Sequence, residues 1–594
     1  MIKVVFDIET DGLDPTVIWC IAAEVVDKPW IKKTWTPDTI HQFPQWLGEI
    51  KADVLIGHNI IGYDLPVLKK LLDFFWWGDV EDTLVISRLH NPSRDKGHSL
   101  KAWGIKMGFP KGDYDEWDKY TPEMLEYCVR DVEVTSRIYD LLSNENISKE
   151  ALDMEYKVAR IINIQSKNGW KFNSGKAISL LADMKQEMFI AEDEVRKVFV
   201  PLPVWNKLNH PLDKAFKGNF SKLEYSKRFQ SQLDKGACFN EEGEWGHTTY
   251  PPFNLGSRPQ IIRQLKHFGW KPKKFTEKDT AIVSDEILQG LKFPEGKLIA
   301  KYIMIQKKVA MVSSWLEAVN NSKDDRIRGT VNSNGAVTGR MTHSKPNLAQ
   351  VPASKKNKQG ELVWGLESEY GTDCRSLFEV EKGYKLVGCD ASGLELRMLA
   401  HYMNDESYTK EVIEGDIHTA NMKAAGLNNR DQAKTFIYGF LYGAGPAKVG
   451  QIVGGGYKEG LNLTENFLNS IPKLGKLREE VLKKAESGVI NGLDGRKVHI
   501  RSSHSALNTL LQGAGALVMK QALILLDKYA KIYKLKYRFV GNIHDEIQTE
   551  VREDQAERFG RLAVDCIKLA GEHFKLNCPL DAEYKIGNSW EKTH

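Results

Sequence analysis

The sequence predicts an α/β protein of several domains, and three observations lead to that prediction. The chain has 594 residues, too many for one hydrophobic core, and 42% of them are apolar, which suffices for several cores. Short β-like apolar runs that end in carboxylates occur near both ends of the chain. Long stretches with helical periodicity lie between them.

The N-terminal segment begins with a short strand that carries two acids on one face. Asp7 and Glu9 are two residues apart, so both point to the same side of the strand. Asp64 follows a second apolar strand, and Asp131 stands one helical turn after Tyr127. Each of these pieces is common alone. The ordered set of four acids and one tyrosine is far more specific.

The middle of the chain reads as helical with one interruption. A polar stretch at 143–146 marks the end of the first domain, and residues 150–325 follow as long amphipathic helices. Block 201–252 begins with Pro-x-Pro, ends with Pro-Pro and shows no clear pattern of its own. We therefore expect an insert between helices at 201–252.

Two strand-like runs in the C-terminal half each deliver an aspartate. Residues 384–390 read as a buried strand that ends in Asp390, and residues 537–551 read as a hairpin whose turn holds Asp545. A single Asp at such a place is usually a cap or turn residue. Paired carboxylates without a His/Cys cluster suit Mg²⁺, and two such ions roughly 3.5–4 Å apart can drive an in-line phosphoryl displacement.

The segment 430–439 between these strands places three functional side chains on one helix face. Arg430, Lys434 and Tyr438 recur at i, i+4 and i+8. Two cations and a ring on one stripe can hold a triphosphate and stack a base. Alone, two basic residues on a helix are more often a solvated surface. The acidic strands on either side favour a nucleotide-binding helix.

Together these segments resemble the motifs of the family A, polymerase I-like DNA polymerases, above all those of short-tailed bacteriophages. Residues 390–397 resemble motif A, 430–439 motif B and 544–546 motif C. Further matching segments occur in order along nearly the whole chain, at 338–340, 416–419, 440–445, 493–499 and 508–512. The N-terminal acids resemble those of a proofreading 3′→5′ exonuclease domain with an RNase H-like fold.

The resemblance implies a right-hand polymerase behind the exonuclease domain. The implied domains are the exonuclease at 1–145, the thumb at 146–325 with the insert 201–252, the first part of the palm at 326–403, the fingers at 404–500, and the second part of the palm at 501–594 with a helix at about 505–530. The chain begins at the exonuclease segment, so no 5′ nuclease domain is expected.

Polymerase roles also follow from the resemblance. Asp390 and Asp545, with the carbonyl of Ala391, would hold two Mg²⁺ ions, for which Mn²⁺ can substitute. The residues implied to bind the nucleotide are Arg430, Lys434, Tyr438, His418 and Glu395, the last closing the 2′ side of the sugar. The residues implied to contact DNA are Arg340, Gln512, Asn508 and His544. A lone His such as His418 is more often an ordinary surface or core residue.

Exonuclease roles are implied in the same way. Asp7, Glu9, Asp64 and Asp131 would hold two further metal ions, and Tyr127 would orient the attacking water. The implied function is a replicative, phage-type DNA polymerase that extends a primer 3′ end by two-metal phosphoryl transfer and proofreads its product. Its substrates would be primer-template DNA and deoxynucleoside triphosphates.

Three rival functions fit the residues less well. A single-subunit RNA polymerase shares the two-aspartate palm, but Glu395 and the N-terminal acids argue against it. A repair nuclease with a decayed polymerase half would be expected to lose Asp390, Asp545 or Lys434, and all three are present. A non-catalytic scaffold has no reason to keep convergent acids against a polyanion.

Charge, cysteines and hydropathy limit the partners and the compartment. The net charge is only +4, which can still hide a basic DNA track beside acidic metal sites. Seven scattered cysteines without a Cys-x-x-Cys pair indicate neither disulfides nor zinc. With no leader and no apolar run near the ~20 residues needed to cross a bilayer, we expect the cytoplasm of an infected bacterial host and no membrane partner.

The insert 201–252 has three possible roles. Phage relatives suggest docking of host thioredoxin or another processivity factor, and helicase-primase and single-strand-binding protein are further expected partners. Seven basic residues against three acids between Lys207 and Lys235 suit direct tracking of DNA. Apolar residues such as Trp205 and Phe229 could equally form a private core with no partner.

Overall fold

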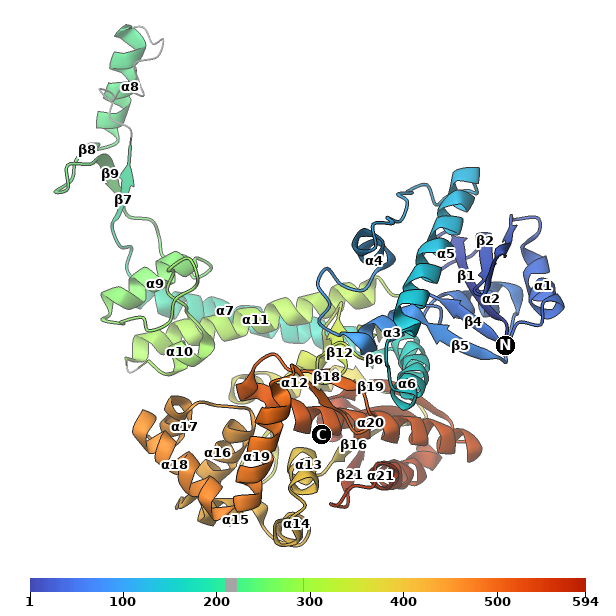
Figure 1. The fold of residues 1–594 in the computed structure, drawn as a ribbon. Coiled ribbons are helices and arrows are strands. Elements are labelled where there is room, and N and C mark those ends of the chain that lie inside the picture. Colours follow the sequence, from blue (N-terminus) through green and yellow to red (C-terminus); the bar gives the residue numbers. More distant parts are fainter. Residues whose placement is uncertain (209–221, 292) are drawn as a thin grey trace. The chain divides into compact units, whose positions relative to one another are not determined.

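The computed structural model describes residues 1–208, 222–291 and 293–594, and the chain divides into two compact units (Figure 1). The first unit comprises Met1–Asn173, Ala318–Ser354 and Arg375–His594. The second comprises Ser174–Glu317 and Lys355–Cys374. Segments that are distant in sequence therefore combine within each unit.

The N-terminal part of the first unit is a five-stranded mixed sheet with helices on its faces. Its strands, in the spatial order β3-β2-β1-β4-β5, are β1 (Lys3–Thr10), β2 (Ile18–Val25), β3 (Lys28–Trp35), β4 (Val54–Gly57) and β5 (Asp79–Asp82). The helices are α1 (Phe43–Glu49), α2 (Asp64–Leu72), α3 (Thr83–His90), α4 (Leu100–Lys106) and α5 (Pro122–Ser143). Val4 and Phe6 enter one core and Val5 the other, because both faces of the sheet are covered.

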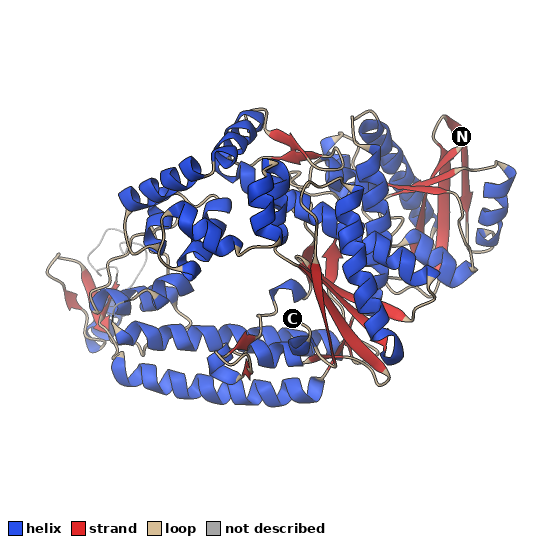
Figure 2. Cartoon of the chain, turned by 90° about the horizontal axis from the view of Figure 1, so that it is seen from below, coloured by secondary structure: helices blue, strands red, loops and turns tan. Residues whose placement is uncertain are grey.

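A second, four-stranded sheet in the first unit has the spatial order β19-β20-β16-β21, and Figure 2 shows these two main sheets as separate groups of strands. Its strands are β16 (Tyr384–Ala391), β19 (Tyr537–Ile543), β20 (Glu546–Arg552) and β21 (Ala582–Gly587). All neighbours are antiparallel, and the register places Asp390 opposite Glu546. The strands predicted at 384–390 and 537–551 are confirmed.

Long helices cover this second sheet. They are α6 (Lys149–Asn168), α20 (Ala506–Ile532) and α21 (Ala556–His573). The segment Ser503–Ile532 is long and apolar enough to cross a membrane, and 72% of its most apolar window is buried inside the protein. The prediction that no apolar run approaches this length was therefore wrong, and burial identifies α20 as a core helix.

Further helices and a hairpin lie between β16 and α20 in the chain. The elements are α13 (Leu394–Met403), α14 (Glu406–Ile413), α15 (Ile417–Ala425), α16 (Arg430–Leu441), α17 (Pro446–Ile452), α18 (Tyr457–Ser470), α19 (Pro472–Ala485), β17 (Val489–Asn491) and β18 (Lys497–His499). Asn429 caps α16 by accepting hydrogen bonds from the backbone of Asp431 and Gln432. Phe436 and Phe440 anchor its buried face.

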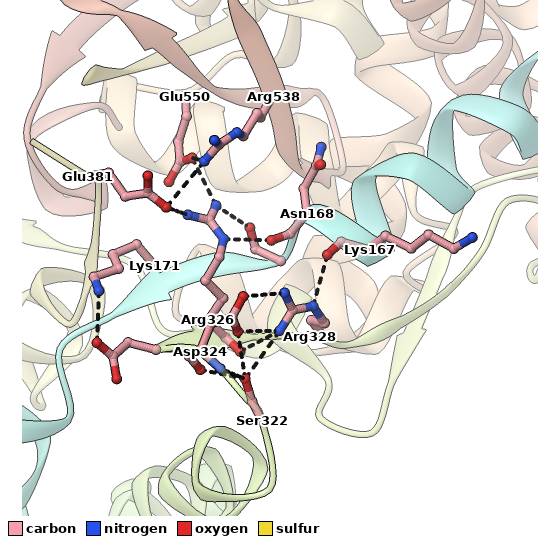
Figure 3. A network of polar contacts seen from close by, with 12 residues as sticks. Lys167, Asn168, Lys171, Ser322, Asp324, Arg326, Arg328, Glu381, Arg538 and Glu550 are labelled. Atoms are coloured by element: carbon pink, nitrogen blue, oxygen red, sulfur yellow. Dashed lines mark hydrogen bonds and ion pairs between the residues drawn. The ribbon is translucent and has the colours of Figure 1, made fainter. Parts of the chain in front are cut away.

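Short strands complete the first unit. They are β6 (Trp170–Phe172), β10 (Arg326–Ile327), β11 (Thr330–Asn332), β12 (Thr342–Ser344) and β15 (Phe378–Glu379). Arg326 on β10 joins three chain segments in the polar network of Figure 3. Its guanidinium donates to Glu550 Oε2 at 2.8 Å and to Glu381 Oε1 at 2.8 Å.

The second unit is largely helical and contains the insert 201–252. Its elements are α7 (Ser174–Val198), β7 (Val204–Lys207), α8 (Lys222–Asp234), β8 (Cys238–Phe239), β9 (Trp245–Thr249), α9 (Arg258–His267), α10 (Asp285–Gln289), α11 (Pro294–Asn320), β13 (Lys355–Lys356), β14 (Leu362–Val363) and α12 (Gly371–Ser376), of which α11 and α12 end beyond it. The insert, for which no pattern was predicted, holds the sheet β7-β9-β8 and α8. Part of its basic stretch, 209–221, lies outside the described residues.

Candidate functional site

The second sheet brings the two predicted aspartates together. Asp390 is the penultimate residue of β16, and Asp545 lies in the turn between β19 and β20. The backbone N–H of Ala391 donates to the carbonyl of Asp545 at 3.1 Å. His544 completes the turn with a left-handed φ of 57°. The strand pairing thus fixes both acids at one edge of the sheet.

Burial and mutual repulsion act on these acids. Desolvation, together with the charges of Glu546 and Asp545, raises the pKa of Asp390 to about 6. Burial also raises the pKa of Asp545, whereas Arg340 and His544 oppose that rise. Neighbouring carboxylates with raised pKa values are suited to exchanging protons for a cation.

Glu546 is tied to the C-terminal segment rather than directed at a ligand. Trp590 Nε1 donates to its Oε1 at 3.0 Å, and His594 Nδ1 lies 2.8 Å from its Oε2. Although burial opposes it, the hydrogen bond with His594 holds the pKa of Glu546 below its usual value.

A cavity of about 470 Å³ opens beside Asp545. Its lining residues are Arg340, Ala391, Gly393, Leu394, Glu395, Tyr438, Tyr442, His544 and Asp545. Tyr442 Oη donates to both carboxylate oxygens of Glu395, at 3.0 and 2.8 Å, and Arg340 Nη2 lies 3.4 Å from Glu395 Oε1. Arg340 Nη2 is also 3.6 Å from Asp545 Oδ1. Arg340 therefore connects the acid pair to Glu395.

Tyr442 lies in the matching segment 440–445, and the sequence predicted no role for it. It lies four residues after Tyr438 at the end of α16, and its ring centroid is 6.3 Å from that of Tyr438. Extending the i, i+4, i+8 pattern of this helix by one more turn would have found it.

The predicted stripe on α16 is present, and its three residues have different surroundings. Arg430 and Lys434 are exposed and do not line the cavity, whereas Tyr438 does. Arg430 forms a two-point ion pair with Asp416, at 2.7 and 3.0 Å. The ring of His418 lies 6.3 Å from that of Tyr438. The structure thus brings His418 to the same helix face.

Gln512 and Asn508 lie one turn apart on α20, and both are half-buried. Arg340 and His544 border a small cavity of about 30 Å³ with α20 residues, among them Ala516 and Met519. The loop of Arg340, the turn of His544 and α20 are therefore neighbours. The predicted DNA-contacting residues come from these three elements.

The N-terminal sheet assembles a second acidic centre. Asp7 and Glu9 lie on β1, Asp64 is the first residue of α2, and Tyr127 and Asp131 lie on α5. Burial raises the pKa of Asp7, and the charges of Glu9, Asp64 and Asp131 raise it further, so all four acids are neighbours. Burial also raises the pKa of Glu9 to about 8 and that of Asp64 to about 7.

Two more side chains reach this centre and were not predicted. The thiol of Cys128 donates to the backbone carbonyl of Asp7, with a sulfur–oxygen distance of 3.4 Å, and Cys128, Asp7 and Glu9 offer ligand atoms within 4.8 Å of one another. Lys111 forms an ion pair with Asp131. Cys128 adjoins Tyr127 in sequence, whereas Lys111 lies in a loop without periodicity, so only its tertiary contact reveals it.

Comparison with known proteins gives consistent results. The family model described as DNA polymerase family A matches residues 223–592. The chain is 34% identical over 682 aligned residues to the DNA-directed DNA polymerases of Enterobacteria phage T3 and of Escherichia phage T7, and each alignment covers 93% of this chain and 95% of the relative. A solved structure, the "POL domain of Pol1 from M. smegmatis complex with DNA primer-template and dNTP", has a similar fold, with a TM-score of 0.74 at 18% identity over 100% of this chain and 96% of that one.

Proposed function

The chain belongs to DNA polymerase family A and is a DNA-directed DNA polymerase similar to those of phages T3 and T7, and from this premise we propose its reaction in detail. It extends a primer 3′ end with deoxynucleotides by two-metal phosphoryl transfer and removes misplaced nucleotides with an N-terminal 3′→5′ exonuclease. The observation that supports this most is the hydrogen bond from Ala391 to Asp545, which holds Asp545, at the edge of a cavity, beside the end of β16 that carries Asp390.

The donor set of this centre fits divalent magnesium. Asp390, Asp545 and the carbonyl of Ala391 offer hard oxygen ligands, and the pKa values of both acids are raised. When bound, two such ions activate the primer 3′-hydroxyl and neutralise charge on the phosphates, and Mn²⁺ can substitute. The strands fix the two carboxylates before substrate arrives, so the site is preorganised.

The incoming nucleotide is proposed to lie along α16. Lys434 and Arg430 contact the triphosphate, with the guanidinium of Arg430 oriented by Asp416, and His418 supports the same phosphates. Tyr438 stacks near the sugar and base. Glu395, held by Tyr442, closes the 2′ side, so a ribose hydroxyl clashes or loses its hydrogen bonds.

Primer-template DNA is proposed to contact the neighbouring loop and helix. Arg340 and Gln512 reach minor-groove acceptors, which every correct base pair offers at N3 or O2. Asn508 and His544 contact the same strand region. Such contacts detect mismatches without reading sequence, as replication requires.

The four acids of the N-terminal sheet are proposed to hold two more divalent ions. Asp7, Glu9, Asp64 and Asp131 supply oxygen ligands from three elements, and Tyr127 orients the attacking water. Burial of the acids excludes bulk water from the centre, which strengthens their hold on a cation.

The decisive experiment separates the two activities by mutation. Asp545→Ala should abolish extension of a primed strand in Mg²⁺ and leave 3′-end degradation intact, whereas Asp7→Ala with Glu9→Ala should do the reverse. Asp554→Ala is a matched control, because Asp554 is an exposed acid of the same half that pairs with Arg552. Loss of both activities from either variant in a folded protein would contradict two separate centres.

The insert 201–252 is proposed to dock a processivity partner such as host thioredoxin. Trp245 packs between Phe229 and Phe239, with ring centroids 6.0 and 5.1 Å away, which also supports a private core. Phe239 and Tyr250 leave 58% and 65% of their surface exposed for a partner. Helicase-primase and single-strand-binding protein are further proposed partners.

Deleting 201–252 and measuring product length with and without thioredoxin separates the three roles of the insert. If the insert docks thioredoxin, thioredoxin should lengthen the products of the intact chain but not those of the deletion variant. A loss without thioredoxin dependence would favour direct DNA tracking. Unchanged product length in both conditions would rule out docking.

A further inference from the structure

We propose that Lys111 is a sixth functional group of the N-terminal acidic centre, where its ammonium contacts the phosphate of the nucleotide being removed. This inference rests on the exonuclease function proposed above. It adds a cation to a centre for which four acids and one tyrosine were predicted.

The side chain of Lys111 lies between two groups of the centre. Its Nζ forms an ion pair with Oδ2 of Asp131, whose side chain is 3% exposed, and lies 4.4 Å from the centre of the Tyr127 ring. Tyr127 and Asp131 are one turn apart on α5. Among the residues that the structure describes, Lys111 is the one cation that forms an ion pair with any of the four acids.

The loop that carries Lys111 is anchored on both sides of it. The guanidinium groups of Arg130 and Arg137 lie 3.3 and 3.5 Å from the centre of the Phe109 ring, and Arg130 Nε donates to the carbonyl of Pro110 at 3.0 Å. On the other side, Trp19 Nε1 donates to the carbonyl of Trp117 at 2.9 Å. These contacts hold the loop against α5 and β2, so the ammonium is placed by the fold.

The backbone at Lys111 also packs closely against α4. A Cβ added to Gly104 would lie 2.8 Å from the carbonyl oxygen of Phe109 and 3.0 Å from the backbone nitrogen of Lys111. Only glycine leaves room for this approach. The position of the Lys111 backbone therefore depends on glycine at position 104 of α4.

Phosphodiester hydrolysis builds up negative charge that a cation at such a place can offset. A water oxygen forms a bond to the terminal phosphorus and loses a proton, while the bond from phosphorus to the 3′-oxygen of the preceding nucleotide breaks. That oxygen keeps the electron pair and takes up a proton. Negative charge grows on the non-bridging oxygens, which lie among four acids, and an ammonium can donate hydrogen bonds to them.

Lysine suits this task while it remains paired with Asp131. An ammonium has three N–H donors, so one can stay on the carboxylate and others can reach the phosphate. A competing role is that Lys111 only occupies the position of a metal ion. Removing the lysine would then raise the exonuclease rate, above all at low Mg²⁺. The two roles therefore predict changes of opposite sign in the exonuclease rate.

The test compares Lys111→Met with Lys101→Met in the full chain. Met keeps the aliphatic stem against Tyr127, and Lys101 is an exposed lysine nearby that pairs with Asp113 at 3.3 Å. Single-turnover removal of one 3′ nucleotide from a single-stranded oligonucleotide is measured over a range of Mg²⁺. We expect Lys111→Met to lower kcat by about tenfold to a hundredfold at every Mg²⁺ concentration. Lys111→Arg should recover part of the loss, and polymerisation should stay unchanged.

Binding in EDTA gives a second readout without hydrolysis. Lys111→Met should bind a 3′-labelled single strand several-fold more weakly than Lys101→Met does. An exonuclease rate at or above that of the wild type, a loss that high Mg²⁺ reverses, or binding equal to that of the control would overturn the role of Lys111. A wild type that removes no nucleotide would instead remove the exonuclease function itself, and this inference with it.

Discussion

Replacing Arg326 by Met should strongly destabilise the first unit. Its guanidinium donates to the carboxylate of Glu550 at 2.8 Å and to the backbone carbonyls of Asn168 and Gly169 at 2.6 and 2.8 Å (Figure 3). The side chain of Glu550 is 1% exposed. The nearest other cation is Arg538, at 3.7 Å. Without Arg326, Glu550 is left as a buried acid with one distant partner.

The size of the effect follows from burial. Breaking a buried ion pair by removing one partner costs about 3–5 kcal/mol in the free energy of unfolding. Arg328→Met is the matched control from the same figure, because Arg328 pairs with Asp324 where the two side chains are 37% and 46% exposed. Exposed pairs contribute about 0–1 kcal/mol. The two variants should therefore differ by at least about 2 kcal/mol.

Urea unfolding measures the difference as a shift in midpoint at constant slope. Burial raises the pKa of Glu550 and Arg326 lowers it, so removing Arg326 raises that pKa further. The folded variant then binds more protons than its unfolded chain, and its stability falls as pH rises above the usual carboxyl range. The loss of unfolding free energy in Arg326→Met, relative to Arg328→Met, should grow from pH 5 to pH 8. Equal midpoints for the two variants, or a deficit that shrinks with pH, would refute the reasoning.

Two further predictions concern the two centres. Glu395→Ala should raise ribonucleotide incorporation by about a hundredfold, which corresponds to a few kcal/mol. Tyr442→Phe should have a smaller effect in the same direction, because it only frees the carboxylate of Glu395. Unchanged ratios of deoxynucleotide to ribonucleotide incorporation would contradict the closed sugar pocket. In EDTA the melting temperature of the N-terminal sheet and its helices should fall as pH rises. In the folded protein the pKa of Glu9 is about 8 and that of Asp64 about 7, both above their unfolded values, so folding favours the protonated acids. Mg²⁺ should restore stability most at high pH, and a Mg²⁺ effect independent of pH would count against metal binding there.

Local patterns predicted the elements that carry the chemistry, while long-range contacts stayed hidden. The short apolar runs that lead to Asp390 and Asp545, and the helical spacing from Arg430 to Tyr438, are properties of neighbouring residues, so the sequence displays them. The contact of Lys111 with Asp131 joins a loop to a helix, and no periodicity records it. The internal fold of the insert also escaped prediction, since its short strands pair across a helix of thirteen residues.

A buried charge network fixes α6 against α20 and the turn between β17 and β18. Glu155 on α6 accepts from Arg496 Nη1 at 2.7 Å and from Lys520 at 2.5 Å, and Asp494 pairs with the same arginine at 2.7 Å. Ser148, at the start of α6, donates to the carbonyl of Asp494. Burial lowers the pKa of Lys520 to about 8, so dehydration of these charges has a real cost. Because only the matched arrangement offsets that cost, the network favours one position of α6 over a sliding apolar contact, and α5 directly precedes α6 in the chain.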